Sequence, residues 1–224
     1  MMGTMKLIGV LKNAYEAVLD AVFPLRERTL RTKERTLQDI PLVPTVHELL
    51  HARITTLMEY RDLAAQDLVR SLKYDGSAYA ASLAAGLLAD YLREELSSAR
   101  TFSTKKILLV PVPLHHSRAR ERGFNQIELV LKALPEEFRD GSLATLSPPT
   151  LVRTRATSPQ TRLPRSERLS NVAGAFAVND EESLRKTHIF LIDDVTTTGA
   201  TLVNAATPLK RAGAEVTLLA LARA

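Results

Sequence analysis

The chain has 224 residues, 45% of them hydrophobic and 25% charged, which is typical of a globular protein and excludes a disordered or fibrous one. It contains no cysteine, so disulfides and thiolate metal sites are excluded and we expect a cytoplasmic protein. The apolar runs are too short to cross a bilayer, so no membrane partner is expected.

The net charge of +5 is unevenly distributed along the chain. Residues 101–170 hold twelve Lys and Arg against six acidic residues, so this window alone exceeds the surplus of the whole chain. A polyanionic small molecule would explain such a concentration of positive charge, and so would a nucleic acid.

The N-terminal part is predicted to be mainly helical. Apolar residues at three- and four-residue spacing predict helices over 5–23, 47–58 and 62–72, with an exposed turn or small hairpin over 25–45. Acidic Glu16 and Asp20 interrupt the first segment, which therefore does not read as a signal peptide. A turn over 73–76 and an alanine-rich helix over 78–96 follow.

Strands and helices then alternate. The sequence predicts strands over 107–110, 151–153, 176–178, 189–192 and 215–221, and helices over 126–134 and after residue 201, the latter ending near Gly213. The basic segment 154–175 has little that could enter a core and is predicted to be a lid loop. This order predicts a mostly parallel, twisted α/β sheet flanked by helices, with a helical N-terminal appendage.

The most informative stretch is residues 189–201, with the sequence IFLIDDVTTTGAT. Its four apolar residues predict a buried strand, and ligands of open α/β sheets lie beyond the carboxyl ends of such strands. A Thr- and Gly-rich loop that enters a helix offers hydroxyl and N–H donors to a phosphate. The carboxylates of Asp193 and Asp194 suit sugar hydroxyls or a hydrated Mg²⁺ instead. The stretch therefore predicts a sugar-phosphate site.

This stretch closely resembles the phosphoribosyl pyrophosphate (PRPP) motif of type I phosphoribosyltransferases. The resemblance implies that Asp193 and Asp194 hold the ribose and, through water, Mg²⁺. The 5′-phosphate would bind to the loop formed by Thr196, Thr197, Thr198, Gly199, Ala200 and Thr201. Thr197 occupies the place where purine-salvage relatives carry an aspartate as general base. Either the acceptor needs no base there, or the protein is not catalytic.

A second polar segment follows the predicted strand 107–110. It carries three arginines among its loop residues, and arginine side chains match phosphate oxygens, so the segment is a candidate pyrophosphate loop. Its candidate residues are Pro113, Arg118, Arg122, Gly123, Asn125 and Gln126. Two alternatives stay open: the arginines form a solvated face, and Asn125 and Gln126 only cap the helix that they begin.

Four blocks follow one another along the chain: Lys73-Tyr74-x-Gly76, residues 110–126, residues 151–176 and the stretch from Ile192 to Thr201. In this order they resemble the ComF family, a branch of type I phosphoribosyltransferase-like proteins. The resemblance implies a bacterial-type cytoplasmic protein linked with DNA uptake in competent cells, with a poorly defined substrate. Many relatives carry an N-terminal zinc ribbon, which this chain cannot form without cysteine, so no zinc is expected.

Three further basic residues are candidates. Lys73 is either a phosphate contact or an ordinary turn residue. Arg162 and Arg168 lie on the predicted lid and are candidates for a catalytic role, although a basic loop is often only a solvated face.

The sequence divides into residues 1–60, an N-terminal appendage that is a candidate hood over the site, and residues 61–224, the phosphoribosyltransferase-like domain. The first hypothesis is a pentosyl-transferring enzyme that uses PRPP with Mg²⁺ and an unidentified acceptor. The second is a non-catalytic regulator that binds PRPP or a nucleotide. The third is a protein that interacts with single-stranded DNA. Relatives of this fold often dimerise, so a homodimer is also considered.

Overall fold

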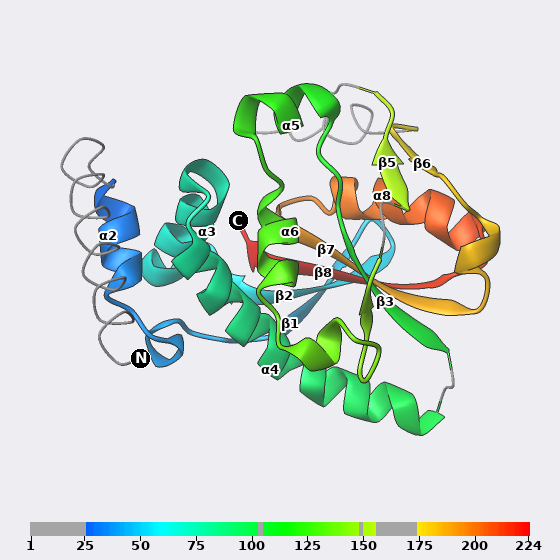
Figure 1. Cartoon of the computed structure of the whole chain (residues 1–224), viewed down its shortest axis with the longest axis horizontal. Helices are drawn as coiled ribbons and strands as arrows, with labels where there is room; N and C mark the ends of the chain where they lie inside the picture. The colour runs from blue at the N-terminus through cyan, green and yellow to red at the C-terminus, as the bar shows by residue number, and fades with distance from the viewer. Residues whose placement is uncertain (1–25, 103–104, 148–149, 156–173) are drawn as a thin grey trace, which may run out of the picture.

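The computed structural model describes residues 26–102, 105–147, 150–155 and 174–224, which form a sheet between two layers of covering elements (Figure 1). The N-terminal elements are α2 (Glu27–Lys33), η1 (Leu37–Asp39), β1 (Thr45–Leu49), β2 (Ala52–Glu59), α3 (Leu63–Asp75) and α4 (Ala78–Phe102). Next come β3 (Lys106–Pro111), α5 (His116–Arg122), α6 (Gln126–Lys132), η2 (Glu136–Phe138), β4 (Thr145–Leu146) and β5 (Leu151–Arg153). The last are β6 (Phe176–Val178), η4 (Glu182–Leu184), β7 (Thr187–Thr196), α8 (Ala200–Arg211) and β8 (Glu215–Arg223).

The main sheet has six strands in the order β1-β2-β8-β7-β3-β4. Only β1 runs antiparallel to its neighbour, and every other pairing is parallel. The strands β5 and β6 form a separate antiparallel pair. The predicted mostly parallel α/β sheet flanked by helices is therefore confirmed.

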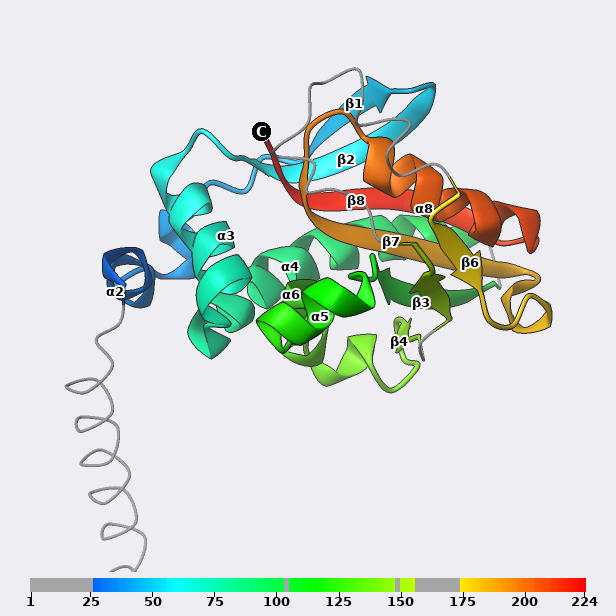
Figure 2. The same cartoon turned by 90° about the horizontal axis from the view of Figure 1, so that it is seen from above.

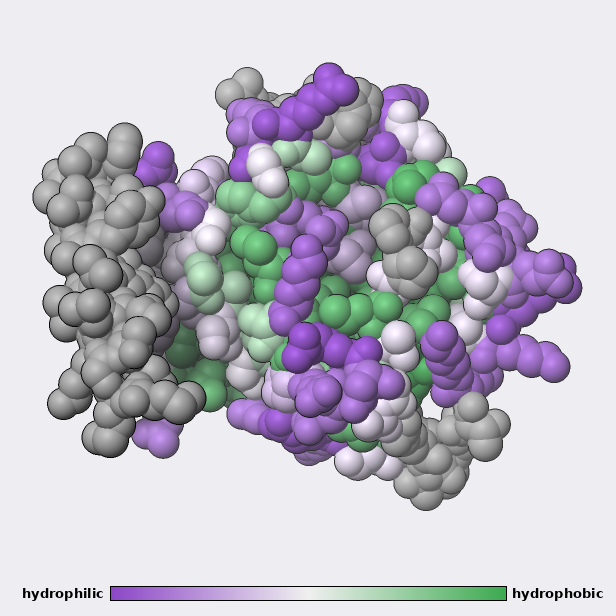
Figure 3. Space-filling model, viewed as in Figure 1, coloured by the Kyte–Doolittle hydropathy of each residue, from purple (hydrophilic) through white to green (hydrophobic). Residues whose placement is uncertain are grey.

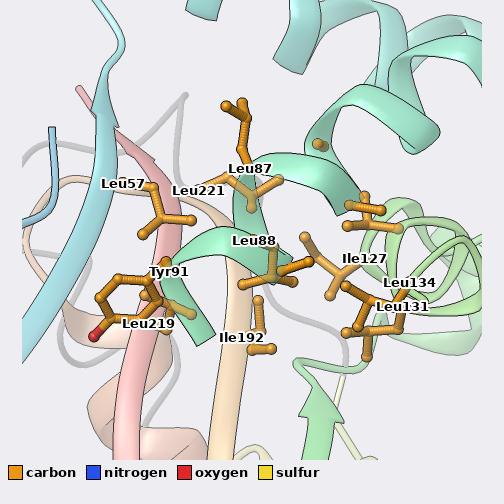
Figure 4. Packing of buried hydrophobic residues seen from close by; sticks show 14 of the residues in the cluster. Leu57, Leu87, Leu88, Tyr91, Ile127, Leu131, Leu134, Ile192, Leu219 and Leu221 are labelled. Atoms are coloured by element: carbon orange, nitrogen blue, oxygen red, sulfur yellow. The ribbon is translucent and has the colours of Figure 1, made fainter. Parts of the chain in front are cut away.

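Each face of the sheet packs against its own layer, as the view from above shows (Figure 2). Successive strand residues point to opposite faces. Phe190 and Ile192 of β7 pack on the side of α3, α4 and α6, and Figure 4 shows Ile192 there beside Leu88 and Ile127. Ile189 and Leu191 pack on the other side, against α8 and the β5–β6 pair. The sheet is therefore buried on both faces, as the apolar run of β7 predicted.

Ion pairs hold helix α2 against α3. The predicted exposed turn or small hairpin over 25–45 is therefore wrong for the part that forms α2. Arg28 donates two 2.9 Å hydrogen bonds to Asp75 at the end of α3. Arg31 donates bonds of 2.8 and 2.9 Å to the buried carboxylate of Asp67, which Arg35 also contacts at 3.0 Å. The three-residue spacing of Arg28 and Arg31 places these two side chains on one face of α2, and Arg35 follows just beyond the end of the helix.

The predicted helix over 47–58 is wrong, because β1 and β2 form a hairpin there. Its turn residues Leu50 and His51 both have positive φ, of 53° and 59°. Hairpin turns of this kind usually contain Gly or Asn, and neither is present here. The predicted domain boundary at residue 60 stays a prediction. The main sheet contains strands from both sides of that boundary, because β2 pairs with β8.

All the predicted strands are confirmed, as are the helices over 62–72, 78–96, 126–134 and after residue 201. The predicted turn at 73–76 is instead the end of α3, which closes at Gly76 with a φ of +57°. The predicted helix over 5–23 and the lid within 154–175 lie outside the described residues, apart from the ends of the latter. Within the described part of the chain, no helix combines the length and the hydrophobicity needed to span a membrane.

Candidate functional site

The two segments predicted to bind the ligand emerge side by side. Strands β3 and β7 are parallel neighbours, with Pro111 opposite Ile192, and the backbone N–H of Val112 donates a 2.8 Å hydrogen bond to the Ile192 carbonyl. The segments that follow them therefore begin at the same edge of the sheet. This is the edge at which open α/β sheets bind ligands.

The acidic pair lies inside β7 rather than beyond its end. The strand continues to Thr196 because β8 pairs with it residue by residue, with Asp193 opposite Ala220 and Thr196 opposite Arg223. Since side chains alternate along a strand, Asp193 and Asp194 point to opposite faces of the sheet. The pair therefore cannot act as one two-carboxylate surface, and each aspartate has its own surroundings.

Asp194 is buried and held by two side chains from the face that carries α3 and α6. The ammonium group of Lys73 lies 3.2 Å from Asp194 Oδ2, and the Gln126 amide donates a 2.5 Å hydrogen bond to the same oxygen. Asp194 Oδ1 accepts a 2.7 Å bond from the backbone N–H of Val195. Both carboxylate oxygens are therefore engaged within the protein, and Lys73 compensates the buried charge.

Asp193 is partly exposed. Its Oδ1 accepts a 2.8 Å hydrogen bond from the Asp194 backbone N–H. Withdrawal from water, and then the negative charge of Asp194, raise the pKa of Asp193 to about 7, against the opposing effects of that hydrogen bond, Lys73 and Arg153. Asp193 can therefore gain or lose a proton near neutral pH.

The predicted phosphate loop joins β7 to α8. Thr196, Thr198 and Ala200 are buried, whereas Thr197 and Thr201 are partly exposed. Thr198 Oγ1 accepts a 3.4 Å hydrogen bond from the backbone N–H of Ala200, where α8 begins. The exposed threonines of the loop therefore lie at a helix N-terminus, where backbone donors and the helix dipole favour an anion.

Gly199 is required for two reasons. Its φ is +79°, a region that side chains disfavour. A Cβ at this position would also lie 2.7 Å from Ile54 Cδ1 and 3.0 Å from Leu49 Cβ. The hairpin β1–β2 therefore packs directly on the loop, so part of the N-terminal 60 residues adjoins the candidate site.

The predicted pyrophosphate loop is partly helical, because residues 116–122 form α5. Arg118 belongs to this helix, and Pro113 precedes it, partly buried. Arg122 closes the helix and donates a long, 3.4 Å hydrogen bond to Gln126 Oε1, while Gly123 follows with a φ of +77°. The segment therefore contains more regular structure than its composition indicates.

Asn125 and Gln126 have different tasks. Asn125 is the N-cap of α6, since its Oδ1 accepts a 3.0 Å hydrogen bond from the Ile127 N–H. Its amide nitrogen also donates a 3.1 Å bond to the Val112 carbonyl. The capping interpretation is thus confirmed for Asn125, whereas the Gln126 side chain reaches Asp194.

The block Lys73-Tyr74-x-Gly76 packs against the segment 122–126. The Tyr74 ring has the guanidinium of Arg28 at 5.3 Å and that of Arg122 at 5.9 Å from its centroid. A Cβ on Gly76 would lie 2.9 Å from the Phe124 ring. Segments that are far apart in the sequence therefore form one continuous cluster that ends at Asp194.

Sequence reasoning missed two basic residues near the site. Arg28 lay in a segment predicted to be a turn, and only its spacing to Arg31 and Arg35 could have indicated a helix. Arg153 was assigned only to a strand, yet its charge acts on Asp193. The candidates Arg162 and Arg168 lie outside the described residues.

Of the two aspartates, only Asp193 suits a metal site, and that site is of one kind. Among the described residues, no three His, Cys, Asp or Glu side chains converge on a common point. Mg²⁺ is usually held by one or two carboxylates, several waters and substrate phosphates. Asp193 fits such a site, whereas the oxygens of Asp194 are already engaged.

No protein-family model matches the chain. Individual proteins do. Over 166 residues the chain is 32% identical to the DNA utilization protein YhgH of Escherichia coli, an alignment that covers 72% of this chain and 67% of that protein. The chain belongs to the ComF family. The predicted family membership is therefore confirmed.

Other ComF-family relatives align over similar lengths. The Salmonella typhi protein of the same name is 34% identical over 148 residues, which cover 66% of this chain and 61% of that protein. The competence protein ComFC of Streptococcus pneumoniae is 31% identical over 152 residues, which cover 68% of this chain and 60% of that protein. The chain thus spans about three fifths of the length of these relatives.

Proposed function

We propose that this ComF-family chain has the type I phosphoribosyltransferase fold and binds PRPP with Mg²⁺. The single observation that supports this most strongly is the meeting of two segments at one sheet edge. The loop after β7 enters a helix N-terminus beside a partly exposed aspartate, and the segment after β3 begins next to it. A sugar with a phosphate at one end and a pyrophosphate at the other matches that layout.

Each part of PRPP is assigned to its own residues. The 5′-phosphate is proposed to lie against the loop from Thr196 to Thr201, with donors from Thr197, Thr201 and the start of α8. Asp193 accepts hydrogen bonds from the ribose hydroxyls. The pyrophosphate lies against residues 113–126, where Arg118 and Arg122 supply positive charge. Bound Mg²⁺ would neutralise pyrophosphate charge.

Asp194 has a different proposed role from that of its neighbour. With Lys73 and Gln126 on one of its oxygens, it is a positioning residue that ties α3 and α6 to β7. Through its backbone N–H it also orients the Asp193 carboxylate. This arrangement keeps the ribose-binding carboxylate fixed with respect to both the phosphate loop and the pyrophosphate segment.

The proposed reaction is transfer of the phosphoribosyl group to an acceptor. The bond between the ribose C1 carbon and the pyrophosphate oxygen breaks, pyrophosphate leaves with the bonding electrons, and a lone pair of the acceptor forms the new bond to C1. Any proton on the attacking atom passes to water after the site reopens. Arg162 and Arg168 are proposed to close over the phosphates and exclude water during this step. Residues 1–60 are proposed as the hood, with the β1–β2 hairpin seated on Gly199.

Calorimetric titration with PRPP and Mg²⁺ tests the binding. Wild type is expected to bind one equivalent, and Asp193→Asn to lose most of the affinity. Asp90→Asn is a matched control, because Asp90 is exposed on α4 and pairs only with Arg93 among the contacts described. A well-folded wild type that binds no PRPP would refute the proposal.

A regulatory role without turnover is the second candidate, favoured by Thr197, a threonine where purine-salvage enzymes carry their base. PRPP binding without pyrophosphate release across a broad acceptor panel would support it. Detection of pyrophosphate would instead support the enzyme.

The names of the relatives suggest a biological process. We propose that this chain, like proteins named for DNA utilization and competence, serves in the use or uptake of DNA. Direct contact with single-stranded DNA is tested by titration at about 50 and 200 mM salt, because phosphate-driven binding weakens steeply over that range. No binding at the lower salt concentration would exclude direct contact and leave a role through PRPP.

A further inference from the structure

A cavity lies beside the carboxyl end of β3, beyond the end of the short edge strand β4. Strand β4 has two residues and pairs with β3 only at Leu108 and Leu109. Among the described residues, the final hydrogen bond to this edge runs from the Ser147 N–H to the Leu109 carbonyl, at 3.1 Å. Strand β3 continues to Pro111, so its carboxyl end has no described strand beside it on that side. A cavity of about 590 Å³ occupies this place.

The walls of the cavity are largely apolar and come from four elements. Val110 of β3, Leu131 of α6, Leu146 of β4 and Leu151 of β5 all line it. Figure 3 shows apolar surface gathered between α6 and β3, with hydrophilic residues around it. The volume falls within the range of about 300–1,000 Å³ typical of small-molecule sites, and such sites are mostly apolar.

The charged residues at the cavity favour an anion. Lys132 and Arg153 line it against a single acid, Glu128. Arg153 is anchored, since its guanidinium lies 5.3 Å from the centroid of the Phe176 ring on the paired strand β6. Two hydroxyl groups add hydrogen-bonding capacity, because Ser147 Oγ and Thr150 Oγ1 lie 2.6 Å apart at this cavity.

This cavity lies beside the proposed PRPP positions. Neither Asp193, Asp194 nor any residue of the loop 196–201 lines it. It adjoins them, because Pro113 and Leu114 belong both to its lining and to the segment proposed to hold pyrophosphate, and because Arg153 acts on the Asp193 carboxyl. A ligand bound here would therefore touch the back of that loop.

We propose that this cavity binds a planar aromatic acid, with the ring against the apolar walls and the carboxylate on Arg153 and Lys132. An aromatic ring matches walls built from Val and Leu side chains, and a guanidinium pairs well with a carboxylate. The proposal does not rest on PRPP binding and stands whether or not the proposed reaction occurs.

Calorimetric titration with naphthalene-2-carboxylate tests the site. Wild type is expected to bind one equivalent, and the neutral amide naphthalene-2-carboxamide to bind about tenfold more weakly. Absence of saturable binding, or a stoichiometry well above one, would overturn the proposal.

Two variants locate the binding. Leu146→Trp fills the cavity and should abolish binding of both compounds, whereas Val43→Trp, on an exposed residue before β1, should leave it unchanged. Arg153→Met removes the charge but keeps an apolar chain, so it should weaken the carboxylate about tenfold and leave the amide unaffected. Lys210→Met on α8 is its matched control. Equal loss of both compounds in Arg153→Met, or full binding in Leu146→Trp, would overturn the assignment.

Discussion

Lys73 Nζ and Asp194 Oδ2 lie 3.2 Å apart, joining α3 to β7 across more than half of the chain. The contact joins two of the sequence blocks that resemble the ComF family, and Gln126 from a third such block contacts the same oxygen. Asp194 is buried, and Lys73 is the cation beside it. The ion pair therefore stabilises the centre of the candidate site.

Lys73→Met is expected to destabilise the protein by about 3 kcal/mol, because it leaves a buried carboxylate without its cation. Urea denaturation at pH 7 measures the change. Lys105→Met is the control, since its pair with Glu215 lies on the surface and should contribute at most about 1 kcal/mol. Adding Asp194→Asn to Lys73→Met should restore part of the lost stability. Equal destabilisation by Lys73→Met and Lys105→Met would contradict a stabilising role for the Lys73–Asp194 pair.

Asp193 should make stability depend on pH. Its pKa is raised from an ordinary 3.8 to about 7, so between these values the folded state binds more protons than the unfolded state. The free energy of unfolding that this group contributes therefore falls as the pH rises from about 4 to about 7. Asp193→Asn should thus be more stable than wild type at pH 8, with a smaller gain at pH 5. Urea denaturation measures the stability difference between Asp193→Asn and wild type. An equal difference at pH 5 and pH 8 would contradict the raised pKa of Asp193.

Gly199→Ala should cost more stability than the same change at another glycine with positive φ. Gly123 has a φ of +77°, and a Cβ added there would have nothing within 4 Å, whereas the Cβ of residue 199 would meet Ile54 and Leu49. Gly123→Ala therefore reports the backbone cost alone, about 1–2 kcal/mol. Thermal or urea denaturation should show a larger loss for Gly199→Ala, and equal losses would mean that the hairpin does not press on the loop.

Asp67 should hold α2 in place. Hydrogen bonds from the Arg31 guanidinium, and then from Arg35, keep the pKa of Asp67 below its ordinary 3.8, so its contribution is present at neutral pH and lost as the pH falls below that value. Asp67→Asn is expected to cost about 3 kcal/mol and to speed hydrogen exchange in α2. Glu27→Gln, which removes the exposed partner of Arg31, should cost less than about 0.5 kcal/mol. Unchanged exchange in Asp67→Asn would contradict the assignment.

The sequence predicted the parts of the fold that depend on local pattern. The apolar run 189–192 and the alternation of strands and helices were sufficient to predict the parallel sheet and its edge. The β1–β2 hairpin was mistaken for a helix because Leu57 and Met58 follow Ile54 at helical spacing, and because Leu50 and His51 occupy turn positions usually held by Gly or Asn.

The candidate site was predictable as a set of residues but not as a set of contacts. Asp193 and Asp194 were read as one acidic pair, and only the pairing of β7 with β8 up to Thr196 separates them onto opposite faces. The partners of Asp194 come from distant helices, so no local pattern could assign Lys73 and Gln126 to it. Arg153 gave no signal because a strand arginine is ordinarily a surface residue.

The most direct test of the proposed function is calorimetric titration of wild type and Asp193→Asn with PRPP and Mg²⁺ at pH 8, where the Asp193 carboxylate is mostly ionised. The account predicts one binding site in wild type, with affinity lost in the variant although the variant is at least as stable. PRPP binding that is equal in both proteins, or absent from a folded wild type, would contradict it.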